Sequence, residues 1–415
     1  MPAAQALRGW LEDERGAMVE LLELLAAAES PTLEPQSQRA PLALLAAELE
    51  RAGLVVRTVR GTEVGHHLYA RPRRRGAPYQ LLLGHVDTVW PRGTLASMPL
   101  RQEGGLLFGP GVIDMKGGLV VLVFALRALA ELGLEPAVTP VVFVNTDEEI
   151  GSPDSTRWLR LLARSAVRAF VLEAAEGSDG KLKIARKGLG RFTVTVHGRA
   201  AHAGTSFEEG VSAILELSTQ VQRLFALNDP GSGVTVNVGT IDGGLRANVV
   251  APRASAVVGV RAPTAEAAQR LEASIRALEP TLPGAVVEVE GGFDGRPPME
   301  PSARNRALLG TAVRLGHKLG VFLEDAGLVG GGSDANTTSL YTATLDGLGP
   351  RGDGSHAAHE HVVVASLPER AALLALLLLE PAEAPAARTR RRRAAARITG
   401  GSGAHGQAGV AARPH

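Results

Sequence analysis

The 415-residue chain contains no cysteine. This absence excludes disulfide bonds and thiolate metal sites, so histidine, aspartate and glutamate are left as metal ligands. Long apolar runs are also missing, and Leu373–Leu379 is far shorter than the roughly 20 residues of a membrane span. The first residues lack the apolar centre of a secretion signal, so we expect a cytoplasmic protein with no membrane partner. A formal net charge of +1 gives no overall attraction to nucleic acid.

The length and the pattern of apolar residues predict two domains. In the first part, apolar strands alternate with helical segments, which predicts an α/β domain with a mostly parallel sheet flanked by helices. From Gly188 the pattern becomes βαββαβ, with helices at 208–226 and 264–278, which is the ferredoxin-like α+β unit. We therefore expect a first domain built from 1–187 and 296–380, an inserted α+β domain at 188–295, and a disordered tail at 381–415.

The stretch LLLGHVD, residues 81–87, ends an apolar strand in a histidine and an aspartate. His85 and Asp87 point to the same side because strand side chains alternate. One of the two side chains can bind a metal ion while the other orients the side chain that binds it. The alternative is a buried histidine tied to its neighbouring aspartate.

Further acids follow other apolar segments. Asp114 lies between glycines in GPGVIDMKGG, at a strand-to-helix turn. It is a further candidate for the site, and the alternative is that it only caps the helix. Glu148 and Glu149 follow the strand VVFVNTD and face opposite ways, unless they belong to a solvated loop. Glu173 ends one more strand. Ligands of such sheets gather outside the carboxyl ends of the strands, so we expect these acids and His85 at one edge.

These segments resemble the M20 family of zinc peptidases and amidohydrolases, in particular its glutamate carboxypeptidase branch. The resemblance covers residues 5–380. The matching segments occur in the family order and are GHVDTVWP, GPGVIDMKGG, NTDEEIGS, VLEAAEG, ARKGLGRFTVTVHGRAAHAG, RANVVAPRASAVVGVRA, RPPMEPS, GGGSDAN and GDGSHAAHEHV.

The resemblance implies two zinc ions per subunit, although cobalt or manganese would suit the same ligands. His85 and Glu173 would bind one ion, and Glu149 and His356 the other. Asp114 would bridge both ions and be followed by a cis peptide.

The remaining roles are also implied by the resemblance. Glu148 would be the general base, and Asp87 would support His85. His356 is preferred to His359 as the ligand because the family histidine lies four residues before a glutamate, here Glu360.

The inserted domain resembles the family's lid and dimerisation domain. His202 would reach the active site, in several relatives from the partner subunit, although it could also be a structural turn histidine. Asn248 and Arg296 would hold the substrate carboxylate, and Arg261 matches a further arginine of the lid. An exposed linker charge is the alternative for Arg296.

The predicted function is therefore a dizinc hydrolase that cleaves an amide bond. It would release a C-terminal amino acid, glutamate, from a small N-acyl or peptide substrate, and would form a homodimer through the lid domain. The alternative within the family is an aminoacylase or deacetylase with another side-chain preference. An alternative of another class is nucleic-acid binding by the arginine-rich segment 388–397, although we do not expect nucleic acid as a partner.

Overall fold

The computed structural model describes residues 2–73 and 78–381. The tail that we expected to be disordered lies outside the described residues from position 382 on. Within the described residues, no helix is both long enough and apolar enough to cross a membrane.

A six-stranded sheet forms the centre of the first domain, in the order β1-β2-β6-β3-β7-β14. Strands β6, β3, β7 and β14 run parallel, whereas β1 and β2 add an antiparallel edge. The strands are β1 (Leu54–Val59), β2 (His67–Pro72), β3 (Tyr79–His85), β6 (Thr139–Asn145), β7 (Ala166–Val171) and β14 (Ala343–Leu345). This arrangement confirms the predicted α/β class with a mostly parallel sheet.

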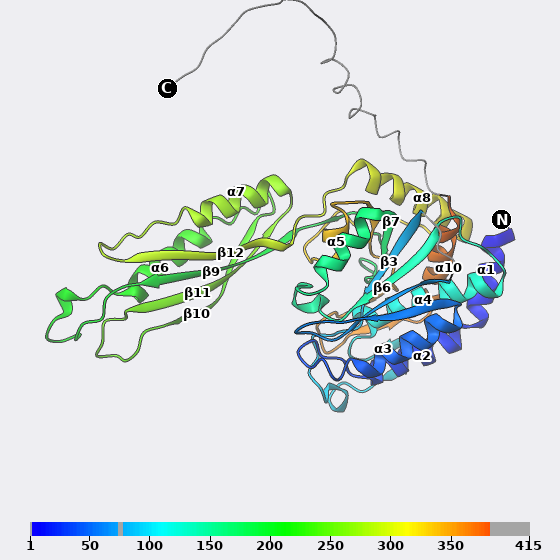
Figure 1. Cartoon of the computed structure of the whole chain (residues 1–415), viewed down its shortest axis with the longest axis horizontal. Coiled ribbons are helices and arrows are strands. Elements are labelled where there is room, and N and C mark those ends of the chain that lie inside the picture. Colours follow the sequence, from blue (N-terminus) through cyan, green and yellow to red (C-terminus); the bar gives the residue numbers. More distant parts are fainter. Residues whose placement is uncertain (1, 74–77, 382–415) are drawn as a thin grey trace, which may run out of the picture. The chain divides into compact units, whose positions relative to one another are not determined.

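Helices cover both faces of the sheet (Figure 1). They are α1 (Pro2–Asp13), α2 (Arg15–Ala27), α3 (Arg39–Arg51), α4 (Gly117–Glu131), α5 (Thr156–Ser165), α8 (Ala303–Leu319), α9 (Asp334–Thr338) and α10 (Ser366–Leu379). Leu82 of β3 packs into the larger apolar cluster with α4 and α10, while Leu81 and Leu83 pack on the other face against Leu159 of α5. The alternation of β3 side chains therefore builds two core layers around one strand.

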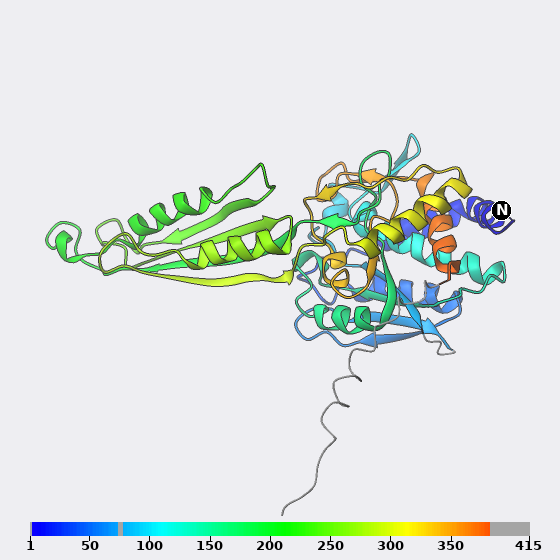
Figure 2. The same ribbon diagram turned by 90° about the horizontal axis from the view of Figure 1, so that it is seen from above.

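A second sheet lies between residues 188 and 296 and has its own apolar cluster. Its strands pair antiparallel in the order β10-β11-β9-β12. The elements are β9 (Gly188–His197), α6 (Ala213–Phe225), β10 (Thr235–Gly243), β11 (Arg253–Ala262), α7 (Ala265–Arg276) and β12 (Val286–Arg296), which is a βαββαβ order. Helices α6 and α7 lie over the strands when the sheet is seen from above (Figure 2). Phe192, Val194 and Val196 of β9 face these helices, so Arg191 and Thr193 lie on the uncovered face.

Short strands complete the first domain. Strands β4 (Arg101–Glu103), β5 (Leu106–Phe108), β15 (Gly352–Asp353) and β16 (His361–Val363) form one small sheet, and β8 (Ala185–Arg186) pairs with β13 (Leu328–Val329). The helical spacing of residues 4–28 predicts one helix, but the structure has two, separated at Glu14. The sequence Ser-Leu-Pro-Glu from Ser366 is typical of a capping box and predicts Ser366 as the N-cap of α10. The Ser366 hydroxyl instead donates to the Val363 carbonyl, because Ser366 already lies inside the helix.

Candidate metal centre

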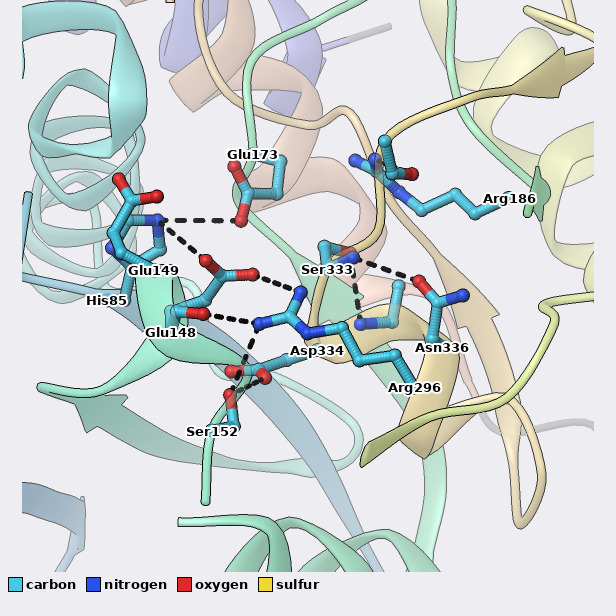
Figure 3. Close-up of polar contacts among 12 residues, drawn as sticks. His85, Glu148, Glu149, Ser152, Glu173, Arg186, Arg296, Ser333, Asp334 and Asn336 are labelled. Carbon is cyan, nitrogen blue, oxygen red and sulfur yellow. Dashed lines mark hydrogen bonds and ion pairs between the residues drawn. The ribbon is translucent and has the colours of Figure 1, made fainter. Parts of the chain in front are cut away.

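The carboxyl ends of three parallel strands deliver the site. His85 is the last residue of β3, Glu148 and Glu149 follow β6, and Glu173 follows β7. Because β3 lies between β6 and β7 in the sheet, the three ends are neighbours. Figure 3 shows His85 and the three glutamates gathered at this edge.

The imidazole of His85 faces several carboxylates. Its Nε2 atom lies 3.3 Å from Asp114 Oδ1, 3.6 Å from Glu173 Oε1 and 4.0 Å from Glu148 Oε2. His85 is 1% exposed, and its Nε2 is a buried nitrogen without a hydrogen-bond partner among the described residues. A buried acceptor nitrogen aimed at carboxylate oxygens fits a cation between them.

A second histidine meets the same aspartate from another segment. His356 Nε2 lies 3.3 Å from Asp114 Oδ2 and 3.2 Å from Glu149 Oε2. Asp114 therefore presents one oxygen to His85 and the other to His356. Ligand atoms of two overlapping groups lie within 4.8 Å of one another, namely His85, Glu148 and Glu173, and His85, Asp114 and Glu149. Imidazole and carboxylate donors in this arrangement fit two divalent ions that share Asp114.

The electrostatics of the site also favour a cation. Burial, and after it the charges of Asp114 and Glu148, raise the pKa of Glu173 well above its usual range although His85 opposes the shift. Burial raises the pKa of Glu149 to about 7 against the opposing bond from His356. Acids crowded in a buried space repel one another, and a divalent ion would offset this repulsion.

Asp87 contacts His85, which it was predicted to support, and several other groups as well. Its backbone oxygen lies 2.9 Å from His85 Nδ1, and its carboxylate lies 3.4 Å from the same nitrogen. The carboxylate also accepts hydrogen bonds from Thr32 Oγ1 at 2.8 Å and from the backbone N–H groups of Glu148 and Glu149 at 3.3 and 3.2 Å. Burial would raise the pKa of Asp87, but the bonds from His85, Thr32 and Glu149 lower it. Asp87 therefore fixes the β3 and β6 ends together.

Glu360 anchors the loop that carries Asp114. Its buried carboxylate accepts from Trp90 Nε1 at 2.7 Å and from the backbone N–H groups of Gly111, Ile113 and Asp114 at 2.9, 3.0 and 3.2 Å. The peptide after Asp114 is cis. In the sequence, Glu360 served only to identify His356 as the histidine four residues before a glutamate. The role of Glu360 in holding the Asp114 loop was not predicted.

A glycine allows this loop to approach the sheet. A Cβ atom on Gly118 would lie 1.8 Å from the Leu172 carbonyl oxygen, next to Glu173. Gly118 therefore permits the close packing of the segment after Asp114 against the end of β7.

The structure places His356, not His359, beside the acids. His356 adopts a φ of 64° at the turn after Gly354. His359 is exposed, and the backbone oxygen of His359 lies 2.9 Å from the His361 ring.

Arg296 is not an exposed linker charge. It is 6% exposed, and its guanidinium forms an ion pair with the Glu148 carboxylate (Figure 3). Nη2 also donates to the Glu148 carbonyl at 2.5 Å and to Ser152 Oγ at 3.4 Å. Behind them, Asp334 accepts from Ser152 Oγ at 2.6 Å and from Asn145 Nδ2 at 2.7 Å. The sequence did not indicate Ser152, Asn145 or Asp334 individually, because each acts through contacts between distant segments.

A cavity of about 700 Å³ opens beside the ligands. Glu148, Glu149, His356 and Arg296 line one part of it, and Arg261 lines another and donates from Nη1 to the Gly330 carbonyl at 2.6 Å.

His202 and Asn248 are neighbours elsewhere on the second sheet's domain. The Ala203 N–H donates to the Asn248 carbonyl at 3.1 Å, and both side chains are exposed. Neither belongs to the described residues that line the cavity. His202 Nδ1 accepts from the N–H groups of Gly204 and Thr205 at 3.1 and 3.2 Å, so the ring proton is carried by Nε2.

Comparisons with known proteins agree with this geometry. A family model described as peptidase family M20/M25/M40 matches residues 81–380. Carboxypeptidase G2 of Pseudomonas sp. (strain RS-16) is 32% identical over 376 residues, which cover 89% of this chain and 90% of that protein. The resemblance inferred from the motifs is thereby confirmed.

Solved structures share the fold. Aminopeptidase PepT from Bacillus cereus matches with a TM-score of 0.69 at 21% identity, covering 88% of this chain and 98% of that one. A dinuclear metal-binding peptidase of the M20 family from Bacillus subtilis matches with a TM-score of 0.64 at 13% identity, covering 89% and 98%.

Proposed function

Because the chain belongs to peptidase family M20/M25/M40 and is a metal-dependent hydrolase, we propose that it uses two zinc ions to release a C-terminal glutamate from an N-acyl or peptide substrate. The observation that carries this proposal is the convergence of two histidines and three acids from five segments around Asp114. His85 and Glu173 would hold one ion, Glu149 and His356 the other, and Asp114 both.

Amide hydrolysis requires an activated water and a stabilised oxyanion. Two divalent ions would polarise the substrate carbonyl and lower the pKa of water from about 15.7 to near 7. Glu148 would take a proton from the attacking water and return it to the leaving amine. Its carboxylate suits this role because it faces both the cavity and the ligand cluster.

Arg296 keeps Glu148 in place and lines the cavity. Its planar fork suits a substrate carboxylate, and Arg261 would supply a further donor in the same cavity. Asn248 lies beside His202 outside the cavity of its own chain, so it would supply a donor from the partner subunit. His202 would donate from Nε2 to the developing oxyanion, an interaction typically worth about 2.7–4 kcal/mol.

The second candidate, an aminoacylase with another side-chain preference, uses the same centre. It is favoured by the apolar residues Ile150 and Leu189 among the cavity walls. Relative rates on N-acyl-Glu, N-acyl-Ala and N-acyl-Leu separate the two, since only the carboxypeptidase proposal requires a preference for glutamate.

Replacing Glu148 with glutamine tests the assigned base. The variant should retain two zinc ions by metal analysis and lose about 10²- to 10⁴-fold in kcat. Replacement of Glu324 by glutamine is a matched control, since that side chain is 74% exposed. Retained turnover in the Glu148 variant would refute the assignment.

A homodimer through the second sheet's domain belongs to the proposal. β10 is an edge strand of the second sheet, and Ile214, Leu215 and Phe225 of α6 are 49%, 55% and 47% exposed. This apolar edge supports pairing with a second copy. Light scattering would give a dimer mass, and a monomer mass would remove this part of the proposal.

Mixed dimers test whether His202 acts in the partner's site. Glu148→Gln and His202→Ala chains should each be inactive alone. After random mixing, half of the dimers are mixed and one of their two sites is intact, so about a quarter of wild-type activity should return. No recovery would place His202 in its own chain's site or outside catalysis.

A further inference from the structure

Arginines from four separate elements line the cavity beside the metal centre. They are Arg160 of α5, Arg191 of β9, Arg261 of β11 and Arg296 of β12. Among the described residues that line the cavity, the acids are Glu148 and Glu149, and both belong to the ligand cluster. Glu149 would hold a metal ion and Glu148 is paired with Arg296, so Arg191 and Arg261 leave the rest of the wall positive, and a concave positive wall attracts anions.

Arg296 and Arg261 already have partners in the protein. Arg296 is bonded to Glu148, and Arg261 donates to the Gly330 carbonyl. Arg191 differs, because no hydrogen bond or ion pair of its side chain is found within residues 2–73 and 78–381. Its guanidinium therefore reaches the cavity with all five N–H donors available.

The sheet leaves room around Arg191. On the uncovered face of the sheet, Arg191 pairs with Gly259 of β11 on one side and with Gly292 of β12 on the other. An added Cβ at Gly259 would meet nothing within 4 Å. Arg261 pairs with Leu189, two residues before Arg191 on the same face. A ligand can therefore approach the Arg191 guanidinium without displacing a neighbouring side chain.

We propose that Arg191, with Arg261 beside it, binds a second substrate carboxylate, distinct from the α-carboxylate of the released amino acid. The inference rests on the proposed amide-hydrolase function and assigns to it a dicarboxylate substrate class. The second carboxylate has two sources, namely the side chain of the released residue or the acyl group. An arginine fork recognises either one by paired, charge-assisted hydrogen bonds.

Two matched pairs of substrates test this subsite. N-benzoyl-Glu is compared with N-benzoyl-Gln, and N-succinyl-Leu with N-butanoyl-Leu. In Arg191→Gln, kcat/KM should fall about 10- to 100-fold for the acidic member of one pair and stay within twofold for its neutral member. A selective loss in the first pair assigns the carboxylate to the side chain, and one in the second assigns it to the acyl group.

Two further variants separate charge recognition from damage to the fold. Arg191→Lys should restore part of the preference, because it keeps the charge and loses the fork. Arg253→Gln is the control, since Arg253 lies on the same face of β11, pairs with His197 far along β9, and does not line the cavity. The Arg253 variant should behave as wild type on all four substrates.

Product binding gives a readout that does not depend on turnover. Calorimetry with L-glutamate and L-glutamine on the zinc-loaded protein should show a glutamate preference that shrinks in Arg191→Gln if the side chain is the source. An equal loss on acidic and neutral substrates, or an unchanged acidic preference, would overturn the inference. Absence of turnover on every substrate in the wild-type protein would instead refute the proposed function.

Discussion

Replacing Glu360 with glutamine should weaken both the fold and the metal centre. Oε1 accepts from the N–H groups of Ile113 and Asp114, and Oε2 accepts from Trp90 Nε1 and the Gly111 N–H. Glutamine keeps one oxygen and turns the other into an NH₂ group. Whichever way the amide lies, two of the four donors then face another donor.

The expected cost follows from these contacts. A hydrogen bond to a charged group is worth about 1.5–3 kcal/mol, so losing two should cost about 3–6 kcal/mol. This is a large part of the roughly 5–15 kcal/mol that stabilises a typical domain. Because the loop carries Asp114, zinc affinity should also fall about 10- to 100-fold, as it does when groups that support metal ligands are changed.

Urea unfolding in chelator and zinc competition with a chromophoric chelator measure the two effects separately. Glu324→Gln, in an exposed glutamate, should change the free energy of unfolding by less than about 0.5 kcal/mol. A loss below 1 kcal/mol in Glu360→Gln, together with unchanged zinc affinity, would refute the reasoning that Glu360 anchors the Asp114 loop.

Three further changes have expected outcomes. Asp334→Asn should lower kcat about tenfold and leave KM and the zinc content unchanged, because Asp334 positions Ser152 beneath the Arg296–Glu148 pair. Steady-state kinetics with metal analysis would check this prediction, and loss of zinc would contradict it. Chelation should lower the free energy of unfolding by about 2.7 kcal/mol for each site that was held at 100 times its Kd, as calorimetry can measure. Burial would raise the pKa of Glu216, but bonds from Gln220, Thr281 and Leu282 lower it, so its contribution to stability is present above the unfolded pKa of about 4.3 and is lost as the pH falls through the folded value. Between about pH 6 and pH 3, the free energy of unfolding should therefore fall less steeply with decreasing pH for Glu216→Gln than for the wild-type protein. An equal slope in the two proteins would contradict this.

The strand-end residues could be predicted because their signal is local. Apolar runs end at His85 and just before Glu148 and Glu173, and the rule that ligands gather at the carboxyl ends of parallel strands brings them together. The βαββαβ order was equally visible in the alternation of residues 191–197 and in the helical spacing that follows.

Other parts of the site could not be predicted in this way. Glu360 contacts Asp114 across 246 residues of chain, and Asp334 contacts Ser152 across 182. Both act through hydrogen bonds that form only after the fold brings distant segments together. The break at Glu14 was missed because helical periodicity continues across it.

The buried carboxylates of Asp87 and Glu360 accept hydrogen bonds from main-chain N–H groups beside the ligands, and the Asp87 carboxylate also faces the His85 ring. Such a frame fixes the gap between the imidazoles of His85 and His356 before any ion arrives. The gap should therefore discriminate by ionic radius. It should suit ions that bind at about 2.0–2.2 Å, and exclude calcium, which needs about 2.3–2.6 Å and more oxygen atoms than this frame presents.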